Sequence, residues 1–302
     1  MKIKIYHNQM TPNFESLETV LRSRGCEPVL VAGDADCLLS IGVAQQYMAY
    51  VEAKSLDKPL YCWVDQWLEL PKVSPDGKAV NTKLFEMGEE AYRYASKIFA
   101  TNSVIARKIQ KEHKIKPIII GAPTTISAKH SVRKKQGSHY KEIYFDGIAM
   151  GLNKNIESLF IALKDTKYEL HVSGDAMFQD QLLSNILRDV SLSNSGIVKR
   201  HERERLIKGA AIVIDPATDG LFNPLALDAI LLGVPVLVAD TKENREIWGS
   251  LIPTYSNQDM TALHEEIKNF SLDNYNLEDL QEIAIKYTPA EIVKQLIEEL
   301  KV

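Results

Sequence analysis

The segment Ala211–Asp240, with the sequence AIVIDPATDGLFNPLALDAILLGVPVLVAD, decides the fold class. Its β-branched run ends at Asp215, and a polar turn around Gly220 follows. A helix is predicted from about Asn223 to a stop at Gly233, and the apolar run after Gly233 predicts the next strand. A turn with free backbone N–H groups that opens a helix can bind an anion. The segment therefore predicts a strand–turn–helix–strand unit with an anion site at its turn.

The same alternation of short strands and longer helices is predicted along most of the chain. The expected strands are Lys2–Tyr6, Pro28–Ala32, Cys37–Ile41, Pro59–Val64, Lys97–Ala100, Pro117–Ile120, Glu142–Phe145, Glu169–Ser173, Gly196–Lys199, Ala211–Ile214 and Pro235–Ala239. Helices are expected at Phe14–Arg24, from Ser103 with Asn102 as its cap, and from near Asn155, Ala176, Glu202, Asn223 and Lys242. Such alternation predicts α/β domains with parallel sheets that are covered on both faces.

A polar, basic stretch, KHSVRKKQGSHYK at residues 129–141, interrupts this rhythm. We therefore expect a Rossmann-like N-terminal domain at 1–128, a linker at 129–140, a Rossmann-like C-terminal domain at 141–286 and a last helix at 287–302. Thr288, Pro289 and Glu291 form the predicted capping box of that helix. Two such domains place a ligand cleft between the carboxyl ends of their strands.

The composition excludes several classes of protein. The 302 residues are 45% hydrophobic and 25% charged with a formal net charge of −4, which argues against disorder and against a general nucleic-acid grip. No signal peptide and no membrane-spanning run is predicted. Three cysteines without a CxxC pair argue against a zinc site or a disulfide framework and favour free thiols in a reducing cytoplasm. No metal or cofactor is expected.

The decisive segment resembles the donor site of the retaining GT-B glycosyltransferases called group 1, which carry a two-glutamate motif. The matching positions are Gly220, Phe222, Asn223, Asp228, Ala229, Gly233, Pro235 and Val236. The resemblance implies that Asp228 binds the ribose hydroxyls of a nucleotide-sugar. The place of the first acid, which contacts the donor sugar, falls on Gly220, and Asp219 lies one residue earlier. The last helix resembles the one that crosses back to the N-terminal domain.

Further donor-binding residues follow from the same resemblance. Lys154, in FDGIAMGLNKN at 145–155, corresponds to the lysine that binds the donor diphosphate. The backbone amides of Leu221–Asn223 would stabilise the departing charge. Val198 takes the place of a residue whose backbone reads the nucleobase, and Glu246 matches a glutamate that follows the next strand. The arginine that the family usually has shortly before the lysine is absent here.

The N-terminal half resembles the family less closely. The glycine pair expected after the first strand is replaced by His7-Asn8-Gln9. The histidine expected after the fourth strand is replaced by Asp65, which we interpret as a cleft residue with a catalytic role or as a turn cap. The basic residues among 133–141 either form a solvated linker or attract phosphates or an anionic lipid surface.

The resemblance implies a metal-independent, retaining hexosyltransferase that uses a UDP- or GDP-sugar and an unknown glycan, lipid or protein acceptor. The competing interpretation is a non-catalytic GT-B module that binds carbohydrate or a partner transferase, because the arginine and the glycine pair are missing and the first acid is displaced. A sugar-nucleotide epimerase ranks below both, since we find too few cleft acids for it. An oxidoreductase is disfavoured because no G-x-G-x-x-G follows a strand.

Overall fold

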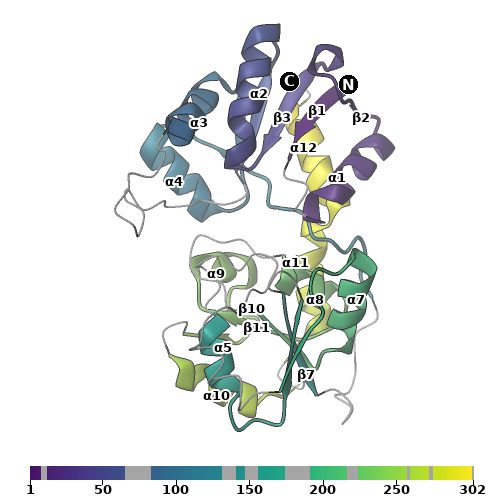
Figure 1. The fold of residues 1–302 in the computed structure, drawn as a ribbon, viewed down its shortest axis with the longest axis vertical. Coiled ribbons are helices and arrows are strands. Elements are labelled where there is room, and N and C mark those ends of the chain that lie inside the picture. The colour runs from purple at the N-terminus through teal and green to yellow at the C-terminus, as the bar shows by residue number, and fades with distance from the viewer. Residues whose placement is uncertain are drawn as a thin grey trace. The chain divides into compact units, whose positions relative to one another are not determined.

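The computed structural model describes residues 1–7, 12–64, 83–130, 141–146, 156–173, 191–215, 224–256, 259–271 and 275–300. The chain divides into two compact units, Met1–Pro123 with Pro289–Val302, and Thr124–Thr288. The first unit therefore contains both ends of the chain (Figure 1). The predicted first domain ends at residue 128, whereas the second unit already begins at Thr124.

The first unit is a parallel α/β domain. Its sheet has the strand order β2-β1-β3-β4-β5-β6, and every pairing is parallel. Its elements are β1 (Lys2–Tyr6), α1 (Pro12–Ser23), β2 (Glu27–Pro28), η1 (Ala32–Asp34), β3 (Cys37–Ile41), α2 (Val43–Leu56), β4 (Leu60–Val64), α3 (Lys83–Tyr94), β5 (Lys97–Ala100), α4 (Ser103–His113), β6 (Ile118–Ile119) and α12 (Pro289–Leu300). The predicted cap of α4 is confirmed, because the Asn102 side chain accepts a hydrogen bond from Ile105 N at 2.9 Å.

The last helix, α12, is part of the core of the first unit. Its apolar stripe includes Ile292 and Leu296, which pack into one cluster with Leu17 and Leu21 of α1. Lys97 Nζ donates to the main-chain oxygen of Glu299 at 2.7 Å and lies 2.9 Å from its carboxylate. The predicted return of the C-terminal helix to the N-terminal domain is therefore confirmed.

The second unit is also a parallel α/β domain, with the strand order β12-β11-β10-β7-β8-β9. Its elements are β7 (Glu142–Asp146), α5 (Ile156–Leu163), β8 (Glu169–Ser173), β9 (Leu192–Asn194), α7 (Arg200–Gly209), β10 (Ile212–Asp215), α8 (Leu225–Leu231), β11 (Val236–Ala239), α9 (Lys242–Trp248), β12 (Thr254–Tyr255), α10 (Met260–Lys268), α11 (Leu277–Ala284) and η4 (Ile285–Tyr287). This is the doubly wound order in which two βαβαβ halves start from neighbouring central strands.

Most predicted strands are confirmed within a residue or two, but two are wrong. The strand expected at Gly196–Lys199 lies instead at Leu192–Asn194, because Gly196 has a φ of 63°, which ends an extended segment. The strand expected at Pro28–Ala32 is reduced to Glu27–Pro28, and a 3-10 turn begins at Ala32.

The two faces of the second sheet differ in character. Alternate residues such as Ile143, Phe145 and Leu170 point into an apolar cluster with α5 and α10. The residues between them, Tyr144 and Asp146 among them, point to the face that α7 covers. All three cysteines are buried and free, as predicted. Within the described ranges, no helix is long and apolar enough to cross a lipid bilayer.

Candidate functional site

The strand order of the second sheet reverses between β7 and β10. Asp146 is the last residue of β7 and Asp215 is the last residue of β10, and both are buried. Doubly wound sheets bind ligands at the carboxyl ends of the strands that flank such a reversal. This edge of the second unit is therefore the candidate site.

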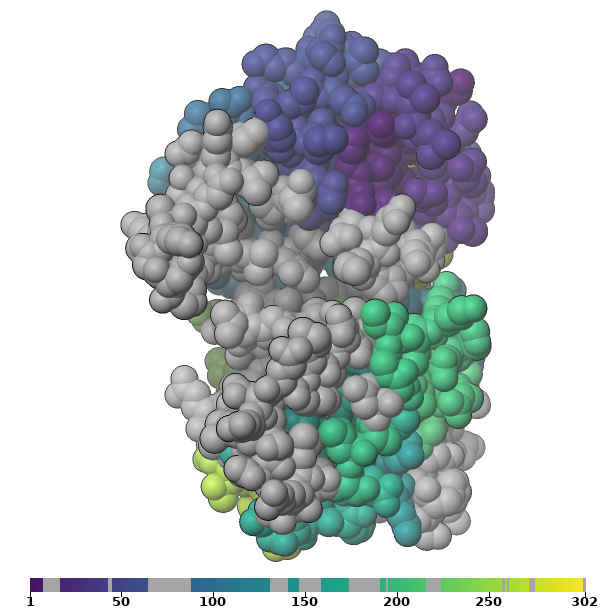
Figure 2. Space-filling view, in the orientation of Figure 1, coloured from purple at the N-terminus to yellow at the C-terminus, as the bar shows by residue number. Residues whose placement is uncertain are grey.

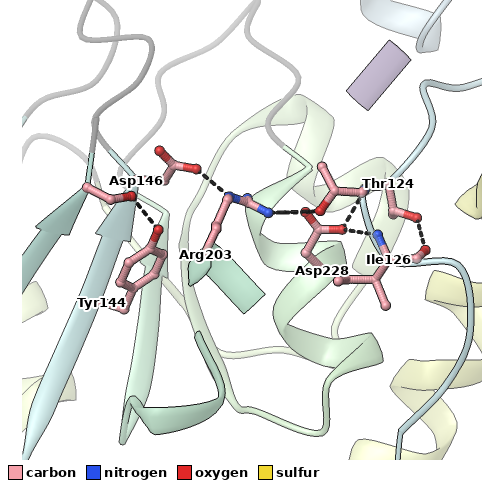
Figure 3. Close-up of polar contacts among 8 residues, drawn as sticks. Thr124, Ile126, Tyr144, Asp146, Arg203 and Asp228 are labelled. Atoms are coloured by element: carbon pink, nitrogen blue, oxygen red, sulfur yellow. Dashed lines mark hydrogen bonds and ion pairs between the residues drawn. The ribbon is translucent and has the colours of Figure 1, made fainter. Parts of the chain in front are cut away.

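Helix α7 brings a buried arginine to this edge. The helix lies at the surface of the second unit (Figure 2), where the Arg205 side chain is 72% exposed. Arg203 is only 5% exposed, because it shares the buried face of the helix with Leu206 and Ile207. Its Nε donates to Oδ2 of Asp146 at 2.7 Å. Figure 3 shows the guanidinium between Asp146 and the carboxylate of α8.

That second carboxylate is Asp228, which is fully buried. Its Oδ1 accepts from Thr125 N at 2.8 Å and from Ile126 N at 3.1 Å. Its Oδ2 accepts from Thr125 Oγ1 and from Arg203 Nη1, both at 2.7 Å. An ionised carboxylate offers about four lone-pair sites. Protein donors therefore use the acceptor capacity of Asp228 in full.

The buried cluster of Asp146, Arg203 and Asp228 holds two carboxylates against one guanidinium. Burial alone lowers the pKa of Arg203, but the charges of Asp228 and Asp146 outweigh burial, so the pKa of Arg203 is raised and the guanidinium stays charged. Burial raises the pKa of the neighbouring Tyr144 well above its usual value, and the charge of Asp146 raises it further. In the described part of the chain, no group of His, Cys, Asp and Glu has the arrangement of a metal site.

The chain that enters the second unit is held by this cluster. We call residues 124–130 the linker segment. Thr125 and Ile126 bond to Asp228 as described, and His130 N donates to Leu231 O at 2.8 Å at the far end of α8. Thr124 N also donates to Tyr287 O at 2.8 Å, which joins the entering chain to the segment that leaves the unit. The linker segment is thus bonded along α8 at both of its ends.

Seven of the ten predicted site residues lie outside the described part of the chain. They are Asp65, Lys154, Asp219, Gly220, Leu221, Phe222 and Asn223. Their predicted roles stay predictions. The described residue Asp146 directly precedes residues 147–155, the segment that contains Lys154.

Three predicted site residues are described, and they lie on different elements. Asp228 lies on α8, where its partners are the protein groups given above, and its expected ribose contact stays a prediction. Val198 is half-buried in the connection from β9 to α7. Glu246 is an exposed residue of α9, and after burial its charge is a second cause that raises the pKa of Tyr287.

The sequence analysis missed Arg203 and Thr125. One signal for Arg203 was present, because it stands three and four residues before Leu206 and Ile207 and so shares their apolar stripe. An arginine on such a stripe requires a buried partner. No comparable signal marks Thr125, because its partner Asp228 lies 103 positions away in the sequence.

Comparison with known proteins shows similarity in structure without similarity in sequence. No model of a protein family matches the chain, and no curated protein matches it. HepE of Anabaena in complex with UDP-glucose aligns with a TM-score of 0.73 and 14% identity, over 99% of each chain. The lipopolysaccharide outer core galactosyltransferase WaaB aligns with a TM-score of 0.66 and 13% identity, also over 99% of each chain. A chain of the GtfA/B complex aligns with a TM-score of 0.59 and 14% identity, over 95% of this chain and 60% of that one.

These alignments cover both units and confirm the predicted fold class. The chain has the GT-B fold, with two Rossmann-like parallel-sheet units and a last helix that belongs to the first unit.

Proposed function

We propose that this protein is a glycosyltransferase that takes a hexose from a nucleotide-sugar, UDP- or GDP-linked, and transfers it with retention of configuration and without a metal ion. The observation that carries the proposal is the near full-length similarity to HepE, whose structures hold UDP, UDP with glucose, and UDP-glucose. The donor-site motif in residues 211–240 also supports it.

The donor would bind at the carboxyl edge of the second sheet, where the strand order reverses. In this proposal the Lys154 ammonium neutralises the diphosphate, together with the backbone amides of Leu221–Asn223. Asp219, next to Gly220, contacts the donor sugar. Asp65, in the acceptor-side N-terminal domain, has a catalytic role. Val198 contacts the nucleobase through its backbone, and Glu246 completes the donor site.

The reaction needs no group beyond these residues and the two substrates. The bond between the anomeric carbon and the diphosphate breaks while the acceptor hydroxyl attacks from the same face. The diphosphate leaves with the electron pair of that bond, and its oxygen accepts the proton of the attacking hydroxyl. The cation and the amides stabilise the charge that develops on the leaving group, which is the largest contribution available to such a site. The acceptor is a glycan, a lipid or a protein hydroxyl.

A second candidate function is a non-catalytic carbohydrate-binding or partner subunit. The observation that favours it is the state of Asp228: the acid that matches the motif is saturated by protein donors. One similar structure, GtfA/B, is a complex, which supports a role as a subunit.

Two measurements on the purified protein separate these functions. A thermal-shift screen with UDP, GDP, ADP and their monophosphates tests donor binding; a ligand at 100 times its Kd stabilises by about 2.7 kcal/mol. Release of nucleoside diphosphate from UDP- and GDP-sugars, with chelator present, tests catalysis. We expect diphosphates to stabilise more than monophosphates, and slow hydrolysis that Asp219→Ala abolishes. Binding without hydrolysis or transfer would favour the subunit, and no binding would reject the nucleotide-sugar proposal.

A further inference from the structure

The strongest unexplained feature is the buried cluster on the face of the second sheet that α7 covers. Arg203 joins Asp146 at the end of β7 to Asp228 on α8, and Asp228 joins the linker segment (Figure 3). The proposed function uses neither Arg203 nor Thr125. These contacts bear on whether Asp228, the acid of the donor motif, can bind a nucleotide.

We propose that Asp228 anchors the linker segment and takes no part in recognising the ribose, and that Arg203 is the positioning residue that holds it in this role. The inference rests on the proposed nucleotide-sugar site and concerns its specificity: residue 228 does not distinguish a ribonucleotide from its 2′-deoxy form.

Protein donors fill the hydrogen-bond capacity of Asp228. Ribose hydroxyls would approach a carboxylate as donors. The four donors already present are two main-chain N–H groups, a threonine hydroxyl and a guanidinium, at 2.7–3.1 Å. A ribose hydroxyl would have to displace one of them. The displaced group would be left buried without a partner, which is unfavourable.

The length and the burial of the Asp228 side chain also keep it from a ligand. Asp228 is fully buried, whereas a ligand-binding carboxylate must present an oxygen to the ligand. Asp is one methylene shorter than the glutamate of the motif it resembles. Thr125 Oγ1 lies against both charged groups, because it donates to Asp228 Oδ2 and accepts from Arg203 Nη1 at 2.9 Å. Each member of the cluster therefore holds the next one in place.

Asp228 bonds to the chain where it enters the second unit. Thr125 and Ile126 are the second and third residues of the second unit after the chain leaves the first. Their N–H groups are bonded to Asp228 and to no strand or helix ladder. Asp228 therefore supplies the acceptor that these buried N–H groups require.

The first part of the test is the melting temperature of the protein without nucleotide. Asp228→Asn should melt lower by about 6 °C or more, because the amide nitrogen of asparagine is itself a donor and leaves some of the four buried donors around residue 228 without an acceptor. The matched control is Asp240→Asn, an aspartate at the end of β11 whose partner Arg245 is exposed; it should melt within about 2 °C of the wild type. An Asp228→Asn protein that melts with the control would overturn the anchor.

A second variant covers the case in which Asp228→Asn does not fold. Thr125→Val keeps the acid and removes one donor, and it should lower the melting temperature by about 3–6 °C. Ser127→Ala, an exposed hydroxyl of the same linker segment, is its control and should change it by less than about 1 °C. Equal melting of the two variants would also overturn the anchor.

The second part is ligand discrimination. The Kd values of UDP, GDP and ADP and of their 2′-deoxy forms are measured for the wild type and for Asp228→Asn. We expect the ratio of the two Kd values to be the same in both proteins within about threefold. A preference for ribose that falls tenfold or more in Asp228→Asn would overturn the inference. Absence of nucleotide binding in the wild type would reject the proposed function, and the melting temperatures would still decide whether Asp228 is an anchor.

Discussion

Two aspartate–arginine pairs lie near the same edge of the second sheet, and they differ in almost everything except their chemistry. Asp228 and Arg203 are buried, and they are also bonded to three further residues, Thr125, Ile126 and Asp146. Asp240 and Arg245 form a bidentate pair at the surface, where the arginine side chain is 63% exposed. A surface pair gains little because water screens it, whereas a broken buried pair leaves a charge without solvent. We therefore expect burial, and not the pairing itself, to decide how much each pair contributes to stability.

The largest expected effect is the loss of the buried cation. Arg203→Met keeps an unbranched apolar stem but leaves Asp146 and Asp228 buried together without a counter-charge. We expect the free energy of unfolding to fall by about 3–5 kcal/mol, measured by urea unfolding at pH 7. Arg200→Met, on the exposed face of the same helix, is the control and should cost less than about 0.5 kcal/mol. Equal urea midpoints for the two variants would contradict the prediction that the buried arginine stabilises the fold more than the exposed one.

A smaller effect is expected at the linker segment. Thr125→Val removes the hydroxyl that donates to Asp228 and accepts from Arg203. Since hydrogen bonds to charged groups contribute about 1.5–3 kcal/mol, we expect a loss of that size in the free energy of unfolding. Thr125→Ser keeps the hydroxyl and should recover most of the loss. A Thr125→Val protein as stable as the wild type would contradict the contribution of the hydroxyl.

The next effect depends on pH. Tyr144 shares a buried hydrogen bond with Ser173, and burial followed by the charge of Asp146 raises its pKa. A raised pKa in the folded state means that the contribution is complete below the unfolded pKa of about 10 and is lost as the pH rises above it. Tyr144→Phe should therefore cost about 0.5–1.5 kcal/mol at pH 7. By pH 11 the wild type should lose about 1.4 kcal/mol relative to Tyr144→Phe, the equivalent of one pH unit, so that the difference vanishes or changes sign. Urea unfolding at both pH values measures this, and a pH-independent difference would contradict it.

The smallest effect is expected at the exposed pair. The hydrogen bond from Arg245 lowers the pKa of Asp240, so the pair contributes to stability above the unfolded pKa of the aspartate and loses that contribution as the pH falls. Asp240→Asn should change the free energy of unfolding by less than about 1 kcal/mol at neutral pH, and still less at high salt. A larger, salt-independent loss would show that exposure does not separate the two pairs.

The fold could be predicted to a large extent from local pattern. Strands such as Lys97–Ala100 and Glu169–Ser173 agree with prediction at both ends, because β-branched runs bounded by polar or turn residues are a short-range signal. The helix cap at Asn102 is equally local. The error at Gly196–Lys199 also has a local origin, because the apolar run does not reveal the positive φ of Gly196. The observed strand lies at Leu192–Asn194.

The candidate site could be predicted only in part. The edge of the second sheet follows from the strand–turn–helix pattern around residue 220, and Asp228 was identified as an acid at that edge. Its partners were not identified, since Thr125 lies far from it in the sequence and hydrogen bonding between distant segments leaves no periodic trace. When the partners are unknown, the local sequence does not distinguish a buried anchoring aspartate from one that binds a ligand.

The sequence by itself determined the α/β class, the two parallel sheets and most of the elements, because hydrophobic periodicity and turn residues act over a few positions. The place of the last helix was implied by the resemblance to the GT-B glycosyltransferases. Only the tertiary structure showed which groups the acid of the motif is bonded to. Burial of Arg203 between Asp146 and Asp228, and the linker segment laid along α8, depend on how α7, α8 and residues 124–130 pack together. The physical reason is that the energy of a charge depends on its solvent and its neighbours, which packing supplies and a linear pattern does not.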